Sequence, residues 1–262
     1  MRGPGGFRPD WTAPATVRAF VTTREGGYSR PPIDSLNLAG HVGDDPGAVG
    51  ANRALVREAL GLPAEPGWLV QVHGTRCTRV TPEGPEDPEA DSGLVDSSGA
   101  VAGVLTADCL PVILARDDGG AAAVAHAGWR GLAGGVLERA AAGLGAPEDL
   151  HAFLGPAIGP RAFEVGPEVR EAFTGSAPED AEAFRPAGER WLADIYRLAV
   201  NRLRRLGVLP ERIAGGGLCT FSDARRFYSY RRDGRTGRLA TLVWLEPGPG
   251  EGGNPRHGDR PG

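Results

Sequence analysis

The fold is decided by residues 101–131, which read VAGVLTADCLPVILARDDGGAAAVAHAGWRG. Three short apolar runs in this stretch, residues 101–105, 112–115 and 121–125, are typical of buried strands. The pattern is interrupted in Thr106-Ala-Asp-Cys-Leu-Pro and ends at His126-Ala-Gly-Trp-Arg-Gly. Side chains at strand ends are held rigidly and can converge from distant positions in a chain. We therefore expect Cys109 and His126 to belong to a functional site.

The rest of the chain mixes strand and helix patterns. Asp44 or Asp45 is expected to cap a helix that ends at Gly61, and a later amphipathic helix is expected to end at Gly207. Residues 128–144 favour a helix, and residues 17–23 and 239–245 favour strands. Residues 68–72 and 76–80 are predicted to pair as a hairpin that bends at residues 73–74. This mixed order predicts an α+β (mixed α/β) fold in a single domain.

Composition sets the boundaries of the domain and excludes several classes of protein. Residues 1–14 are rich in Gly and Pro and are expected to be loose, residues 15–246 to form the catalytic domain, and residues 247–262 to be a disordered tail. A net charge of −4 argues against a nucleic-acid surface, and no apolar stretch is long enough for a membrane span. The chain has no Lys, which excludes Schiff-base chemistry on Lys. Three widely spaced Cys argue against a disulfide framework and predict a cytoplasmic protein.

Two His and one Cys form the main candidate site. The chain has five His and three Cys, and His73, Cys109 and His126 each lie where a strand is expected to end or bend. Imidazole and thiolate are ligands that Zn²⁺ prefers, and three protein ligands leave one position open for water or substrate. The sequence therefore predicts a catalytic zinc site. His41, His151 and His257 are interpreted as structural or surface residues.

Other polar residues near these motifs have two interpretations each. Arg130 suits a phosphate or carboxylate, but a Gly turn with a packed Trp and a surface Arg fits the same residues. Asp108 is expected to hold a ligand His by its second nitrogen. Residues 227–233 are expected to end a strand, where Tyr228 or Tyr230 would stack on a base and Arg231 would bind phosphate, or where this strand end is merely solvated. Asn37 and Arg53 fit turn or cap roles as well as contacts to a substrate.

At these residues the chain resembles the multicopper polyphenol oxidase or laccase-domain family, also called the peptidoglycan editing factor family. The resemblance runs from about residue 22 to residue 245. It rests on Thr23-Arg-Glu-Gly-Gly, Ser35-Leu-Asn-Leu, His41-Val-Gly-Asp-Asp, Gln71-Val-His-Gly, Thr106-Ala-Asp-Cys-Leu-Pro, His126-Ala-Gly-Trp-Arg-Gly, Leu154-Gly-Pro-Ala-Ile-Gly-Pro, Phe163-Glu-Val-Gly and Ser229-Tyr-Arg-Arg-Asp-Gly. One departure is Asp91-Ser-Gly, where relatives carry Asp-Ala and an apolar residue; we expect it to alter a loop without touching a ligand.

The resemblance implies a fold, a ligand set and an activity. The fold would be a layered α/β/β/α sandwich, shared distantly with a cysteine-hydrolase toxin domain. His73, Cys109 and His126 would bind zinc. The implied activity is phosphorolysis of adenosine, inosine, guanosine and methylthioadenosine to base and ribose 1-phosphate, with adenosine deamination beside it. The partners would be a purine nucleoside and inorganic phosphate, and the protein a monomer or weak homo-oligomer.

The numbers of His and Met in the chain help to choose between the activities that the names of this family imply. Five His are too few for a multicopper site, and the only Met is the initiator, so the axial Met of a blue-copper site is missing. Copper-dependent phenol oxidation is therefore disfavoured. The usual His-x-Glu deaminase signature is also absent, which leaves Asp108 as the candidate general acid or base. Arg130 and Arg231 are the candidates to hold phosphate during catalysis.

Two other functions stay open. In a cysteine hydrolase or amidase that edits peptidoglycan precursors, Cys109 would be the nucleophile and His126 its base. A binding or scaffold module would show neither turnover nor bound metal.

Overall fold

Two large β-sheets form the centre of the protein, whose computed structural model describes residues 3–247. The five-stranded sheet has the order β1 (Gly6–Phe7), β2 (Val17–Thr22), β15 (Leu239–Leu245), β7 (Val101–Thr106), β3 (Gly67–Trp68). The seven-stranded sheet has the order β14 (Ile213–Gly215), β10 (Leu150–Leu154), β8 (Leu110–Arg116), β9 (Ala122–Ala127), β6 (Ser92–Val95), β4 (Cys77–Thr81), β5 (Gly84–Pro85). A small third sheet joins β11 (Glu164–Val165), β13 (Arg190–Ala193) and β12 (Phe184–Ala187). The predicted tail, residues 248–262, lies outside the described residues.

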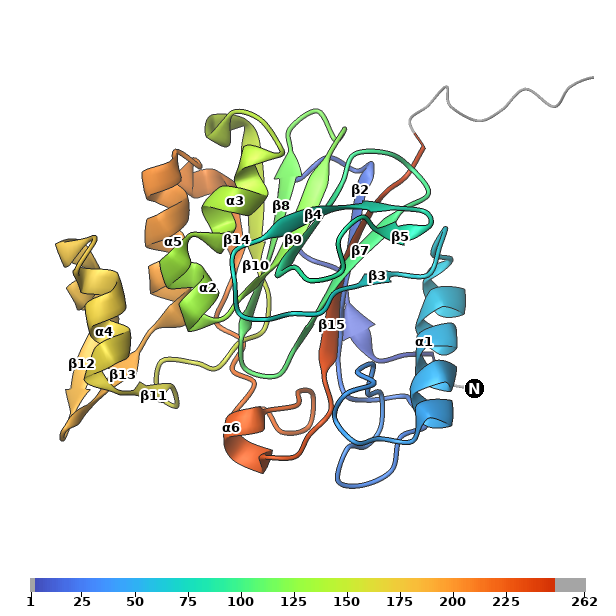
Figure 1. Cartoon of the computed structure of the whole chain (residues 1–262), viewed down its shortest axis with the longest axis horizontal. Helices are drawn as coiled ribbons and strands as arrows, with labels where there is room; N and C mark the ends of the chain where they lie inside the picture. Colours follow the sequence, from blue (N-terminus) through green and yellow to red (C-terminus); the bar gives the residue numbers. More distant parts are fainter. Residues whose placement is uncertain (1–2, 248–262) are drawn as a thin grey trace, which may run out of the picture.

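The outer faces of the two large sheets are covered by helices α1 (Pro46–Leu60), α2 (Trp129–Gly134), α3 (Val136–Ala142) and α5 (Ile195–Leu206) (Figure 1). Helix α4 (Pro167–Thr174) lies beside the small third sheet, and α6 (Tyr230–Asp233) lies near the start of β15. Alternation along β8 shows the layering, because Ile113 and Ala115 pack between the sheets while Val112 and Leu114 pack under α3 and α5. Val56 of α1 packs on the outer face of the five-stranded sheet. The expected α/β/β/α sandwich is therefore confirmed.

Local sequence signals placed most of the core elements correctly. The three apolar runs are β7, β8 and β9, which are buried along nearly their whole length. Asp45 caps α1 by accepting the N–H of Gly47, and Gly61 ends that helix in the left-handed conformation. Helix α5 ends in the same way at Gly207. The predicted helix over residues 128–144 is divided into α2 and α3 by Gly135, whose φ is 99°.

The predicted hairpin over residues 68–80 is wrong. Strand β3 pairs in parallel with β7 in one sheet, whereas β4 pairs in parallel with β6 in the other. Residues 69–76 therefore cross from one sheet to the other instead of turning back. In this segment the carboxylate of Asp91, and not a neighbouring strand, accepts the N–H groups of Val72, His73 and Gly74. The crossing brings His73 to the end of the space between the sheets.

Two further expectations differ from the structure. The N-terminal segment is not loose throughout, since Gly6–Phe7 pairs with β2 and the Trp11 ring lies 6.2 Å from that of Phe153. Residues 227–233 do not end a strand, because Ser229 accepts the N–H of Arg232 and caps the short helix α6. Within residues 3–247, no helix combines the length and apolar character needed to cross a membrane.

Ile113 tests the packing between the two sheets. Its side chain is fully buried there, so Ile113→Ala removes apolar contacts and leaves a cavity that the rigid sheets cannot close. We expect the free energy of unfolding, measured by urea titration, to fall by about 2–5 kcal/mol. Glu189→Ala, at an exposed turn, should change it by less than about 0.5 kcal/mol. Equal effects of the two substitutions would contradict this packing.

Candidate metal centre

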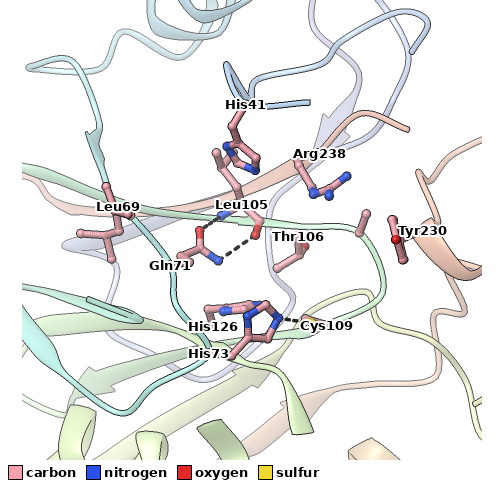
Figure 2. A pocket seen from close by; sticks show the side chains of 12 residues that line it. His41, Leu69, Gln71, His73, Leu105, Thr106, Cys109, His126, Tyr230 and Arg238 are labelled. Carbon is pink, nitrogen blue, oxygen red and sulfur yellow. Dashed lines mark hydrogen bonds between the residues drawn. The ribbon is translucent and has the colours of Figure 1, made fainter. Parts of the chain in front are cut away.

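His73, Cys109 and His126 meet at one end of the space between the sheets (Figure 2). Their ligand atoms all lie within 4.8 Å of one another, and Cys109 Sγ is 3.9 Å from His73 Nε2. Zinc bonds of about 2.0–2.3 Å place neighbouring ligand atoms of a tetrahedron about 3.5 Å apart, so the donor set and its spacing fit such an ion. Within residues 3–247 no fourth His, Cys, Asp or Glu joins this group.

The carboxylate that organises the group is Asp91, which is fully buried. Its Oδ1 accepts the N–H of His73 at 2.9 Å and the Nδ1–H of His126 at 2.8 Å, while Oδ2 accepts the N–H of Gly74 at 2.7 Å. These bonds hold His73 in the left-handed conformation, with φ of 61°, and leave His126 Nε2 free to face Cys109. Such a second contact orients a metal-binding imidazole and makes it a better ligand.

This arrangement corrects two expectations. The departure at Asp91-Ser-Gly was expected to touch no ligand, yet Asp91 in this motif contacts the backbone of one ligand and the ring of another. Asp108 was expected to hold a ligand His, and this is wrong: its oxygens accept Thr220 Oγ1 at 2.6 Å and the backbone N–H of Arg231 at 2.7 Å. Asp91 is separated from His126 by 35 positions, so no local pattern points to the pair.

Two glycines allow α2 to start against the ligands. A Cβ on Gly128 would lie 3.1 Å from both Cys109 Sγ and His73 Cδ2. A Cβ on Gly131 would lie 2.8 Å from the carbonyl oxygen of Gly74 in the crossing segment. The motif that follows His126 therefore needs small residues so that helix, crossing segment and ligands can approach closely.

Without metal, the ligands form a charged pair. Burial acts to raise the pKa of Cys109, but the charge and hydrogen bonds of His126 and then His73 outweigh it and lower that pKa to about 6. Burial acts to lower the pKa of His126, but Cys109 and Asp91 outweigh it and raise that pKa to about 9. The metal-free site thus favours thiolate and imidazolium at neutral pH, and a cation that binds there replaces one proton.

The group opens into a cavity of about 520 Å³, within the usual size range of small-molecule sites. Figure 2 shows the ligands on one side and His41 and Arg238 on the other, with Tyr230 at one side of the opening. Arg238 Nη1 donates to the carbonyls of Thr236 and Gly237, and within residues 3–247 its Nε and Nη2 have no hydrogen-bond acceptor. His41 and Arg238 were missed as site residues; only the resemblance at the His41 motif pointed to one of them.

Most of the other predicted site residues do not line this cavity, although Tyr230 does. Tyr228, the alternative residue for stacking, is fully buried and donates its hydroxyl to the carbonyl of Ile33, so it cannot stack on a base. Asn37 is buried and bonds Asp44 and the backbone of Ala39 and Arg238. Arg53 donates to the carbonyl of Leu38 and lies over the Trp68 ring. Arg130 is exposed and lies over Trp129, and Arg231 donates to the carbonyl of Glu164. Their predicted ligand roles stay predictions, and the structure ties these side chains to other partners.

We predict that Asp91→Asn weakens metal binding. Both carboxylate oxygens face N–H donors, so an amide NH₂ in either place meets a donor. Zinc affinity, measured by chelator competition, should fall about 10–100-fold. The control is Asp118→Asn, in the exposed turn at the other end of β8 and β9. Unchanged affinity in the Asp91 variant would show that the carboxylate does not support the ligands.

The thiol of Cys109 provides a second prediction. In metal-free protein its alkylation by iodoacetamide, followed by peptide mass spectrometry, should rise with pH around a midpoint near 6, because only the thiolate reacts and the pKa of Cys109 is lowered to about 6. Burial raises the pKa of Cys77, which should react only at higher pH. Equimolar zinc should protect Cys109. A Cys109 midpoint near that of an ordinary thiol, about 8.5, would contradict the charged pair.

Known proteins resemble this chain over nearly its whole length. A purine nucleoside phosphorylase of Pseudomonas aeruginosa is 53% identical over 241 residues, which covers 91% of this chain and 97% of that protein. The purine nucleoside phosphorylase YfiH of Escherichia coli is 49% identical over 238 residues, covering 90% and 97%. Among crystal structures, a Neisseria meningitidis protein superposes with a TM-score of 0.87 at 45% identity, covering 93% of this chain and 100% of that one. YlmD from Geobacillus stearothermophilus gives 0.86 at 29% identity, covering 94% and 98%.

A family model gives the same assignment. The model described as multi-copper polyphenol oxidoreductase laccase matches residues 18–246, a span that includes both large sheets and all three candidate ligands. The chain therefore belongs to this laccase-like family.

Proposed function

We propose that this protein is a zinc-dependent purine nucleoside phosphorylase. The observation that carries the proposal is one cavity that has the His73, Cys109 and His126 group on one wall and the guanidinium of Arg238 on another. The names of the relatives from P. aeruginosa and E. coli support the reaction class. The substrates would be a purine nucleoside and inorganic phosphate, with adenosine deamination as a side activity.

The charges in the cavity suit the two halves of this reaction. In phosphorolysis a phosphate oxygen forms a bond to C1′, the bond from C1′ to purine N9 breaks, and the electron pair leaves with the base. Arg238 stays cationic at neutral pH even though burial lowers its pKa, and its free Nε and Nη2 donors suit a phosphate. Burial, followed by the charges of Arg238 and Arg53, lowers the pKa of His41, so it would act as a neutral hydrogen-bonding group beside Arg238.

The metal and the aromatic residue complete the proposal. Zinc held by His73, Cys109 and His126 would supply a Lewis acid or an activated water. Tyr230, 63% exposed at the cavity, would stack on the planar base. Asp91 would keep His126 in the tautomer that binds metal. Zinc is favoured over a set of copper ions because residues 3–247 contain a single His and Cys group of this kind.

The direct test is incubation of the purified protein with adenosine, with and without phosphate. We expect adenine and ribose 1-phosphate only when phosphate is present, and a smaller amount of inosine. Release of neither product would end the proposal. Metal analysis of the same preparation should find about one zinc per chain.

Substitutions of Arg238 and of Arg130 test which of these two arginines binds phosphate. Arg238→Ala removes charged hydrogen bonds worth about 1.5–3 kcal/mol, so the KM for phosphate should rise about 10–150-fold. Arg130→Ala should leave it within about twofold, because Arg130 is exposed and does not line the cavity. The opposite ranking in steady-state kinetics would support the assignment made from sequence.

One observation supports a second candidate function, that of a cysteine hydrolase or amidase. Cys109, His126 and Asp91 are arranged as nucleophile, base and orienting acid, which is the pattern of a cysteine hydrolase or amidase. Metal content separates the two proposals. Turnover of an amide by metal-free protein, with Cys109 trapped by an electrophile, would support the hydrolase. Joint loss of zinc and phosphorolysis in His73→Ala would support the phosphorylase.

A further inference from the structure

Asp108 connects three segments that are far apart in the sequence. It lies between β7 and β8, directly before Cys109, with a left-handed φ of 91°. Its Oδ1 accepts the hydroxyl of Thr220 at 2.6 Å, its Oδ2 accepts the N–H of Arg231 at 2.7 Å, and its carbonyl accepts the N–H of Ile158 at 2.9 Å. Both carboxylate oxygens are therefore occupied by donors from the segment that contains α6.

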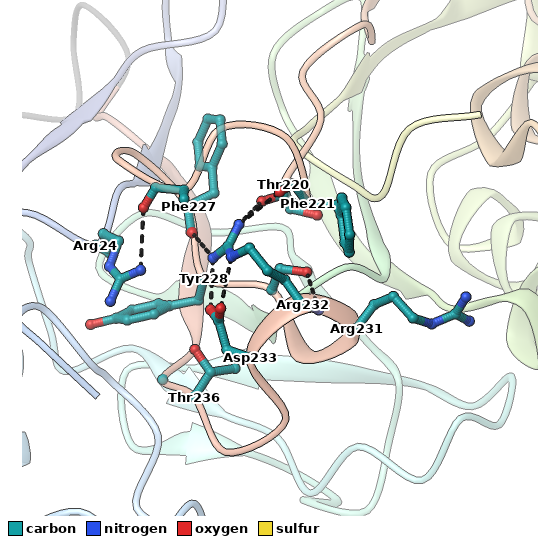
Figure 3. A network of polar contacts seen from close by, with 12 residues as sticks. Arg24, Thr220, Phe221, Phe227, Tyr228, Arg231, Arg232, Asp233 and Thr236 are labelled. Atoms are coloured by element: carbon teal, nitrogen blue, oxygen red, sulfur yellow. Dashed lines mark hydrogen bonds and ion pairs between the residues drawn. The ribbon is translucent and has the colours of Figure 1, made fainter. Parts of the chain in front are cut away.

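That segment is held together as one unit (Figure 3). Arg232 donates to the carbonyls of Thr220, Phe221 and Phe227 and forms an ion pair of 2.7 Å with Asp233. Since these bonds join α6 to the loop before it, a shift at either Asp108 contact moves the loop and the helix together.

The unit carries part of the cavity wall. Tyr230 is the first residue of α6 and directly precedes Arg231, whose N–H bonds Asp108. Because the Tyr230 side chain is largely exposed, its place in the cavity depends on the backbone of α6 more than on packing.

We propose that Asp108 is a positioning residue for substrate binding. Its carboxylate fixes α6 against the turn that carries Cys109, and so sets the separation between the Tyr230 ring and the metal ligands across the cavity. The substrate part of this inference rests on the proposed phosphorylase function. It replaces the acid or base role that the sequence suggested for Asp108.

Two substitutions separate the roles. Asn tolerates a left-handed φ, its Oδ1 can accept the N–H of Arg231, and its Nδ2 can donate to the Thr220 hydroxyl, which also accepts hydrogen bonds. Asp108→Asn therefore keeps both contacts but cannot transfer a proton. Asp108→Gly removes both contacts without a backbone penalty at this φ.

The first measurement does not depend on any substrate. Hydrogen exchange of the Arg231 amide, followed by NMR or by mass spectrometry with fragmentation, should stay within about threefold of wild type in Asp108→Asn. It should accelerate about 10-fold or more in Asp108→Gly, because a hydrogen bond to a charged acceptor is lost. Unchanged exchange in a folded Asp108→Gly protein would overturn the proposal. Thr220→Val, which removes one contact, should give an intermediate rate and serves if the Gly variant does not fold.

The second measurement uses adenosine and phosphate. Asp108→Gly should raise the KM for adenosine about 10-fold while kcat falls less, and Asp108→Asn should restore both constants to within about threefold of wild type with an unchanged pH profile. A loss of kcat beyond about 100-fold in Asp108→Asn, with KM and amide exchange unchanged, would instead identify an acid or base and overturn the proposal. If wild-type protein shows no phosphorolysis, the exchange measurement still decides the positioning role.

Discussion

The buried carboxylate of Asp91 is the interaction on which the site depends. It accepts the N–H groups of residues 72–74 and the Nδ1–H of His126, so one side chain joins the crossing segment to the end of β9. Those N–H groups would otherwise be left without strand partners close to the core, which is costly. A single charge therefore satisfies the backbone of one ligand and orients the ring of another.

The two sheets explain why the site lies where it does. Strand β9 buries His126 on the face between the sheets, at the end of the alternating pattern that packs Ala122 and Val124 inward. The turn between β7 and β8 joins the two sheets and carries Cys109. The crossing segment joins them a second time and carries His73. Both connections are therefore anchored at each end by a rigid sheet, which is the support that a metal site needs.

Charge is separated across the cavity. Cys109 lies on one wall, and Arg238 lies opposite it (Figure 2). An anion that enters is drawn toward the arginine, because on the opposite wall the thiolate of Cys109 is already balanced by the imidazolium of His126. This polarity suits the proposed substrates, the phosphate anion and a neutral purine nucleoside.

The sequence by itself determined the strands β2, β7, β8, β9 and β15, the ends of α1, the C-terminal end of α5 and the three candidate ligands. Those features rest on local signals: apolar runs for β7, β8 and β9, caps at Asp45 and Gly61, and a few His and Cys in motifs without a packing role. The tertiary structure alone decided that residues 69–76 cross between sheets, that Asp91 supports the ligands, and that Arg238 faces them. These features depend on contacts between residues separated by tens to hundreds of positions, such as Asp91 with His126 and Asp108 with Arg231, whose separations are 35 and 123. Such contacts are set by how the sheets pack, and no periodicity along the chain encodes them.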